Sequence, residues 1–341
     1  MLSTGAEVEA QPRPPGIRSE LLQPHLIDIG GGRRLNFYCV GSGSPTVVFE
    51  QGGEGFISNW SKVQPAASAL TRTCFYDRAG FGWSDPPDRP VTGLAVTDDL
   101  RALLRNAGAE GPFVLVGHSI GGFYATLYAD RFPDEVAGLV LVDSAFAGQE
   151  RPLTPERRQI EQARIRHGEG LLLHCSALAR AGRLTLANAA ANNCIPLPAN
   201  STPDEARYIA HAITRPHWHE AEHSQSVNFF PTGKGASVSG RQEIEARRSF
   251  GDMPVAVLSA GIDQDRSWMT AEENRVGAAH WRAGHRKLAA RSVRGRWSIV
   301  PAAGHFIQRD KPEAVIEAIR DVVREVRGSR SPAELDRPFR R

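Results

Sequence analysis

The chain has 341 residues, of which 41% are hydrophobic and 23% are charged, an ordinary balance for a folded globular protein. Its 41 basic and 38 acidic side chains leave a formal net charge of only +3, and no basic stripe carries interleaved aromatic residues. These features argue against a nucleic-acid partner. No stretch approaches the roughly 20 apolar residues that a membrane span needs.

The two ends of the chain differ in composition from the rest. Residues 1–22 and 329–341 are rich in proline, glycine or charge, which predicts a flexible arm and a flexible tail. The N-terminal segment has neither the basic region nor the apolar region of a signal peptide. We therefore expect a cytoplasmic protein.

Between these ends, short apolar runs alternate with stretches of helical periodicity. Runs such as FVLV and LVLV are typical of parallel strands that are covered on both faces. The pattern predicts strands at residues 25–29, 35–40, 46–50, 73–76, 113–116, 139–142, 255–258 and 297–300. It predicts helices at residues 94–107, 120–131, 271–290 and 312–327.

The alternation is interrupted between residues 147 and 248, where alanine, arginine, asparagine and histidine are common and strand signals are weak. We predict that residues 147–248 form a helical cap inserted into an α/β core of residues 23–146 and 249–328. Parallel sheets bind their ligands at the carboxyl ends of the strands. A cap that leaves from such an end would cover the site.

The strongest chemical signal is the motif G-H-S-I-G-G at residues 117–122, between a predicted strand and a predicted helix. A nucleophile elbow requires this context, because a sharp turn must project the serine from the sheet. Glycines two positions before and after Ser119 remove side chains that would obstruct the turn. The following helix directs its N-terminal N–H groups towards a developing oxyanion. Ser119 is therefore the candidate nucleophile.

A second signal, P-A-A-G-H at residues 301–305, lies between the last predicted strand and the last predicted helix. A histidine at a strand end could reach Ser119 across the edge of the sheet. Because a serine hydroxyl is a poor nucleophile until a base removes its proton, His305 is the candidate general base.

Together with the run YDRAGFGWSD at residues 76–85, these two motifs resemble the α/β-hydrolase superfamily and occur in its order. The resemblance covers roughly residues 25–146 and 252–327. It implies the α/β-hydrolase fold, with a mostly parallel eight-stranded sheet flanked by helices, a helical cap and no cofactor. It also implies that residues 76–85 form a structural turn that braces the active-site loops without a catalytic role.

The triad also needs an acid, which orients the histidine and stabilises its cation. Asp143 follows a predicted strand just before the cap, whereas Asp263 and Asp265 follow the strand after it. In the family the acid usually follows the post-cap strand as Gly-x-x-Asp, and the sequence GIDQD at residues 261–265 is out of step with that spacing. Some branches, including certain haloalkane dehalogenases, carry it after the pre-cap strand. We therefore predict Asp143, with Asp263 or Asp265 as the alternative.

Two backbone N–H groups are expected to form the oxyanion hole. One belongs to Ile120, the residue after the nucleophile. The other is expected from the loop EQGGEG at residues 50–55, most directly from Gly53. The family often has His-Gly in this loop, and Gln51-Gly52 keeps the backbone donors.

The four cysteines form neither a CxxC pair nor a zinc-ligand spacing. Cys39 and Cys74 lie in predicted strands, where we expect buried thiols. Cys175 and Cys194 lie in the predicted cap and could pair in an oxidising compartment. In the sequence HWHEAEH at residues 217–223, two histidines have a possible metal spacing, but serine chemistry needs no metal, and we expect packing or substrate contact instead.

These residues predict a hydrolase that cleaves a carboxylic ester of a small molecule, or an amide or lactone, through Ser119, His305 and Asp143. Hydrolysis of a C–C bond stays open because it uses the same triad. Dehalogenases and epoxide hydrolases of this fold use an aspartate nucleophile, so the serine argues against both. The alternative from another class is a ligand-binding or sensing protein with little turnover.

Overall fold

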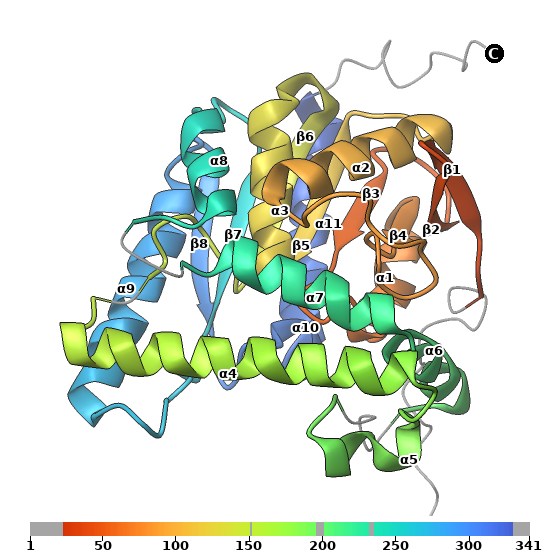
Figure 1. Cartoon of the computed structure of the whole chain (residues 1–341). Helices are drawn as coiled ribbons and strands as arrows, with labels where there is room; N and C mark the ends of the chain where they lie inside the picture. The colour runs from red at the N-terminus through yellow and green to blue at the C-terminus, as the bar shows by residue number, and fades with distance from the viewer. Residues whose placement is uncertain (1–22, 151, 196–200, 232–234, 330–341) are drawn as a thin grey trace, which may run out of the picture.

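The computed structural model describes residues 23–150, 152–195, 201–231 and 235–329. The predicted arm lies outside these residues, and so does the predicted tail apart from Ser329. Within the described residues, one eight-stranded sheet runs in the order β1-β2-β4-β3-β5-β6-β7-β8 (Figure 1). Its strands are β1 Leu26–Gly30, β2 Arg33–Val40, β3 Val47–Glu50, β4 Thr73–Tyr76, β5 Phe113–His118, β6 Val136–Val142, β7 Val255–Ala260 and β8 Gly295–Val300.

The sheet is mixed, with its antiparallel part at one edge. β1 pairs antiparallel with β2, and β2 pairs antiparallel with β4. The other five neighbouring pairs, from β4/β3 to β7/β8, are parallel. The predicted α/β-hydrolase fold with a mostly parallel eight-stranded sheet is confirmed.

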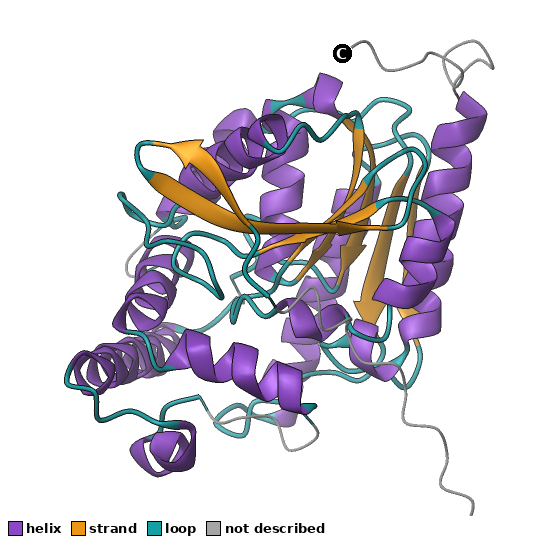
Figure 2. Ribbon diagram, turned by 90° about the vertical axis from the view of Figure 1, so that its right-hand side faces the viewer, coloured by secondary structure: helices purple, strands orange, loops and turns teal. Residues whose placement is uncertain are grey.

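Helices cover both faces of this sheet, as Figure 2 shows with the strands between two helical layers. Successive residues of a strand point to opposite faces, so Val114 and Val116 of β5 belong to one apolar cluster and Leu115 to the other. Burial on both faces explains the continuous apolar runs of the sequence. Helices α1 (Gln64–Leu70) and α11 (Pro312–Ser329) contribute buried residues to the first cluster, and α9 (Ala271–Ala289) contributes buried residues to the second. Helices α2 (Gly93–Asn106) and α3 (Ile120–Arg131) contribute to both.

Between β6 and β7, the described residues form helices and no strand. The long helix α4 (Pro155–Arg180) and α7 (Pro216–Phe229) pack together across the lower end of the sheet in Figure 1. α8 (Val238–Ala246) packs against α7 as well as against α2 and α3. The other helical segments are η2 Ile57–Trp60, η3 Pro133–Glu135, α5 Leu186–Ala189, η4 Ala190–Asn192, α6 Pro203–Ile213 and α10 Ile307–Asp310.

The prediction that Cys39 and Cys74 are free thiols is wrong, because the two residues form a disulfide. Cys39 of β2 lies directly opposite Cys74 of β4, and their Cα atoms are 4.1 Å apart. Directly opposed side chains on antiparallel strands are close neighbours. The sequence placed both residues in strands but did not show that β2 and β4 are adjacent, because β3 separates them in the chain.

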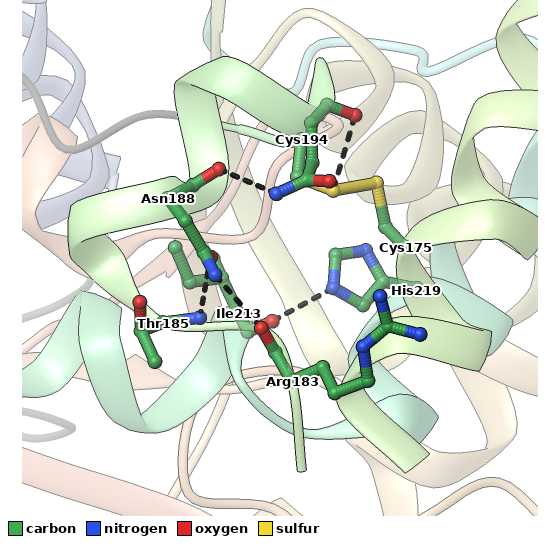
Figure 3. The surroundings of a disulfide bond; sticks show 8 residues. Cys175, Arg183, Thr185, Asn188, Cys194, Ile213 and His219 are labelled. Atoms are coloured by element: carbon green, nitrogen blue, oxygen red, sulfur yellow. Dashed lines mark hydrogen bonds between the residues drawn. A yellow bond between two sulfur atoms is a disulfide. The ribbon is translucent and has the colours of Figure 1, made fainter. Parts of the chain in front are cut away.

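The second pair, Cys175 of α4 and Cys194 after η4, also forms a disulfide, which the sequence had left open (Figure 3). The residues are 19 positions apart, and closing a loop of this length stabilises a fold by about 3 kcal/mol in the chain-entropy model. Disulfides persist mainly in oxidising compartments. They weigh against the expected cytoplasmic location, which stays a prediction. Among the described residues, no helix is long and apolar enough to cross a membrane.

Candidate active site

Ser119 occupies the turn between β5 and α3 with a strained backbone. Its φ is 54° and its ψ is −125°, a conformation that residues other than glycine rarely adopt. A Cβ at Gly117 would lie 2.6 Å from the carbonyl oxygen of Gly121, and a Cβ at Gly121 would lie 2.2 Å from the carbonyl oxygen of Gln51. Both distances are too short for a side chain, so these two glycines allow the turn and the close approach of α3 to the loop after β3.

His305 and Asp143 come together beyond the ends of β8 and β6, two strands that β7 separates in the sheet. His305 Nδ1 lies 2.7 Å from Asp143 Oδ2, although the two residues are 162 positions apart. His305 follows β8 in the loop before α10, and Asp143 follows β6 with a φ of 40°. The Asp143 side chain is 3% exposed and that of His305 is 22% exposed. The hydrogen bond therefore joins a buried acid to a histidine that keeps access to solvent.

The other oxygen of Asp143 accepts two hydrogen bonds. The donors are the backbone N–H of Ala260, at the end of β7, and Trp281 Nε1 of α9, each at 3.0 Å. Burial raises the pKa of Asp143, but the hydrogen bond and charge of His305 outweigh burial and hold this pKa below its ordinary value. Asp143 is thus a charged carboxylate with a fixed orientation.

The alternative acids lie elsewhere. Asp263 forms an ion pair with Arg282 of α9, and its side chain is 42% exposed. Asp265 is exposed in the same loop. Of the three predicted carboxylates, Asp143 is the one that the structure brings to His305.

No hydrogen bond joins Ser119 Oγ to His305 in the part of the chain that the structure describes. The elbow and the loop of His305 are nevertheless neighbours, because the ring of His118, the residue before Ser119, lies 4.6 Å from the ring of His305 between centroids. Catalytic hydrogen bonds of this kind often tighten only when substrate binds.

The loop after β3, which contains the predicted oxyanion donor Gly53, is held by Arg78. This fully buried guanidinium donates to the carbonyl oxygens of Gln51 (2.7 Å), Gly52 (2.6 Å) and Gly53 (3.2 Å). It also forms an ion pair with buried Glu50 at 2.8 Å. Residues 76–85 therefore brace this loop as expected, because one arginine of the segment binds three successive carbonyl groups of the loop.

A model of the alpha/beta hydrolase family matches residues 42–318, most of the chain. The chain belongs to the alpha/beta hydrolase family. The matched region includes the elbow, the loop after β3, Asp143 and His305.

Relatives of this hydrolase share parts of its length. An uncharacterized protein of Schizosaccharomyces pombe is 28% identical over 265 residues, which are 76% of this chain and 43% of that protein. The 2-hydroxy-6-oxo-2,4-heptadienoate hydrolase of Pseudomonas putida is 33% identical over 116 residues, 33% of this chain and 42% of its own. The chain thus spans less than half of either relative. A crystal structure of a putative ancestral haloalkane dehalogenase covers 89% of this hydrolase and 100% of its own chain, with a TM-score of 0.65 and 17% identity, which shows the shared fold.

Helix α7 of this alpha/beta hydrolase brings residues to the site that the sequence did not indicate. Gln225 Nε2 donates to the carbonyl oxygen of Gly53 at 3.1 Å and to Glu222 Oε2 at 2.9 Å. The other oxygen of Glu222 lies 3.6 Å from the position of a Cβ on Gly53. Burial raises the pKa of Glu222 to about 8, with nearby Glu54 adding to the shift and Arg78 opposing it. A carboxyl group whose burial favours the neutral form therefore lies against the predicted oxyanion loop.

His219 of α7 serves packing. His219 is buried, donates through Nε2 to the carbonyl oxygen of Ile213 at 2.7 Å, and packs edge-on against Trp218 beside the Cys175–Cys194 disulfide (Figure 3). Within the described residues, no group of three or more histidine, cysteine, aspartate or glutamate side chains is arranged to hold a metal ion.

Trp281 should affect the rate, because it donates one of the hydrogen bonds that fix Asp143. We expect Trp281→Phe to lower kcat on a working ester about tenfold, since a hydrogen bond to a charged group contributes about 1.5–3 kcal/mol. Trp297→Phe is the matched control, because this substitution also removes one indole hydrogen bond, the one from Trp297 to Ser259 at 2.8 Å. That hydrogen bond does not involve Asp143. Equal effects of the two substitutions would contradict a specific role for Trp281.

Proposed function

We propose that this alpha/beta hydrolase is a serine hydrolase that cleaves a carboxylic ester of a small molecule, with an amide or lactone as related substrates. The observation that carries the proposal is the 2.7 Å hydrogen bond between buried Asp143 and His305, next to a strained Ser119 at the start of α3. An acid, a base and a nucleophile at the carboxyl edge of one sheet are the elements that acyl transfer requires.

In the proposed mechanism, Ser119 Oγ attacks the carbonyl carbon while His305 Nε2 takes its proton. Asp143 holds His305 with the proton on Nδ1 and stabilises the imidazolium. The backbone N–H groups of Gly53 and Ile120 bind the oxyanion of the tetrahedral intermediate. This intermediate expels the alcohol, which receives the proton from His305. Water, deprotonated by His305, then attacks the acyl-enzyme and releases the acid.

A fluorophosphonate probe tests the proposal, because it reacts with activated serines. We expect one covalent adduct by intact mass on the wild-type protein and none on Ser119→Ala. A panel of p-nitrophenyl esters with increasing acyl length then defines the preferred chain length. A folded wild-type protein without an adduct would contradict the proposal and favour a ligand-binding or sensing role. That role would be supported by a ligand that raises Tm without being cleaved.

Hydrolysis of a C–C bond is the second candidate, and the similarity to the Pseudomonas putida hydrolase favours it. The same triad would serve both reactions. Incubation with 2-hydroxy-6-oxo-2,4-heptadienoate separates them, because C–C cleavage destroys the conjugated chromophore. Loss of its absorbance at a rate above that of the best ester would assign the protein to this second reaction.

A further inference from the structure

The side chain of His118, the last residue of β5, contacts the loop that carries His305. Its Nε2 lies 2.9 Å from the backbone carbonyl oxygen of His305. The ring is 2% exposed and packs against the rings of His305 and Phe306, with centroids 4.6 Å and 5.0 Å away. A buried histidine thus links the strand of the nucleophile to the residue proposed as the base.

The geometry defines the tautomer of His118. A carbonyl oxygen can only accept, so Nε2 must carry the proton. Nδ1 has no hydrogen-bond partner among the described residues and faces the loop after β3, where a Cβ on Gly52 would lie 2.8 Å from it. Burial, together with the charge that His305 can carry, lowers the pKa of His118 to about 3. His118 is therefore neutral and does not repel the imidazolium that the proposed mechanism forms on His305.

The loop that carries His305 is held from several sides. The carbonyl oxygen of Ala303 accepts from the N–H of Ile262 at 2.9 Å, and the N–H of Gly304 donates to Asp310 Oδ2 at 2.8 Å. These two contacts tie the loop to the segment after β7 and to α10. The contact from His118 ties it to β5, the strand that leads directly into Ser119.

We propose that His118 is a positioning residue, whose Nε2–H holds the main chain of His305 at the correct distance from the nucleophile strand. The inference rests on the proposed function, in which His305 is the general base. A misplacement of about 1 Å in a catalytic group can reduce a rate about 100-fold. His118 acts through His305 and does not contact the reacting atoms.

Two substitutions separate the N–H donor from the ring. His118→Phe keeps an aromatic ring against His305 and Phe306 but removes the donor, whereas His118→Gln keeps an N–H near the position of Nε2 and removes the ring. We expect the fluorophosphonate labelling rate and kcat to fall about 10- to 100-fold in His118→Phe with little change in KM, and to stay within about threefold of wild type in His118→Gln. Thermal unfolding checks that each variant is folded.

The reverse pattern, with a fast phenylalanine variant and a slow glutamine variant, would assign His118 to ring packing and overturn the proposal. A measurement without turnover tests it independently: ¹⁵N NMR of the His118 ring in Ser119→Ala should show the neutral tautomer with the proton on Nε2. A ring whose only proton is on Nδ1 would overturn the proposal even if both substituted proteins fail to fold. If wild type is not labelled, the proposed function fails, while the tautomer still decides whether His118 can hold the His305 loop.

Discussion

Asp143→Asn is expected to lower kcat on a working ester by about 10⁴-fold with little change in fold. Asn has the shape of Asp, and its Oδ1 can keep both hydrogen bonds, from the N–H of Ala260 and from Trp281. This orientation turns the amide Nδ2 towards His305 Nδ1, in the place of the carboxylate oxygen that accepts at 2.7 Å. Two donors cannot face each other, so His305 moves its proton to Nε2 and can no longer accept one from Ser119. Loss of the correct histidine tautomer typically lowers kcat by about 10⁴-fold.

Asp263→Asn is the matched control for this experiment, because Asp263 is one of the two alternative acids that follow the strand after the predicted cap. Its partner is Arg282, and we expect kcat to stay within about twofold of wild type. The comparison uses kcat on the best ester of the panel, with Tm measured for each variant. A near-normal rate for Asp143→Asn together with a large loss for Asp263→Asn would transfer the role of the acid to Asp263.

The proposed nucleophile and the proposed base could be named from the sequence because both depend on local structure. Ser119 lies in a motif whose glycines have a steric reason within a few residues, and His305 follows a recognisable strand. The choice of acid could not be made in this way, since it depends on which of two strand ends faces the His305 loop. The misaligned GIDQD spacing favoured Asp143, and the geometry brings that residue to His305.

Features that depend on contacts between distant segments could not be predicted from the sequence. The Cys39–Cys74 disulfide requires β2 and β4 to be neighbours, which no local pattern reveals. Trp281 lies on α9, and its position in a helical pattern gave no sign of the acid that it contacts. The boundaries of the strands and of the last helices were predicted closely, because continuous apolar runs and helical periodicity are local signals.

The segment predicted to form a cap was the least predictable part of the chain, and Glu222 illustrates why. Its position on α7 gave a helical pattern but not the contact with Gly53. Because the carboxyl is partly buried without a cation in ion-pair contact among the described residues, its environment favours the neutral form. We therefore expect the charge state of this residue to couple the predicted cap to the loop that we propose to bind the oxyanion.

Glu222→Gln should make the protein less sensitive to alkaline pH. The pKa of Glu222 is raised from its ordinary value to about 8 in the folded state. The contribution of the neutral Glu222 carboxyl to the unfolding free energy is therefore fully present below about pH 4.5. It is lost as pH rises through about 8. A shift of this size corresponds to about 3–5 kcal/mol of unfolding free energy. Glutamine stays neutral, so the unfolding free energy of the variant should exceed that of wild type by about this much at pH 9 and by little at pH 5. Urea denaturation at the two pH values measures the difference.

The matched control is Glu317→Gln on the exposed face of α11, which removes a glutamate without touching the cap. A second readout connects the charge to function. Deprotonated Glu222 would place a negative charge beside the loop proposed to bind the oxyanion, so wild-type kcat should fall as pH rises through about 8, and Glu222→Gln should keep its rate. If Glu222→Gln changed stability equally at pH 5 and pH 9, Glu222 would titrate outside this range, and the proposed coupling between cap and oxyanion loop would be wrong.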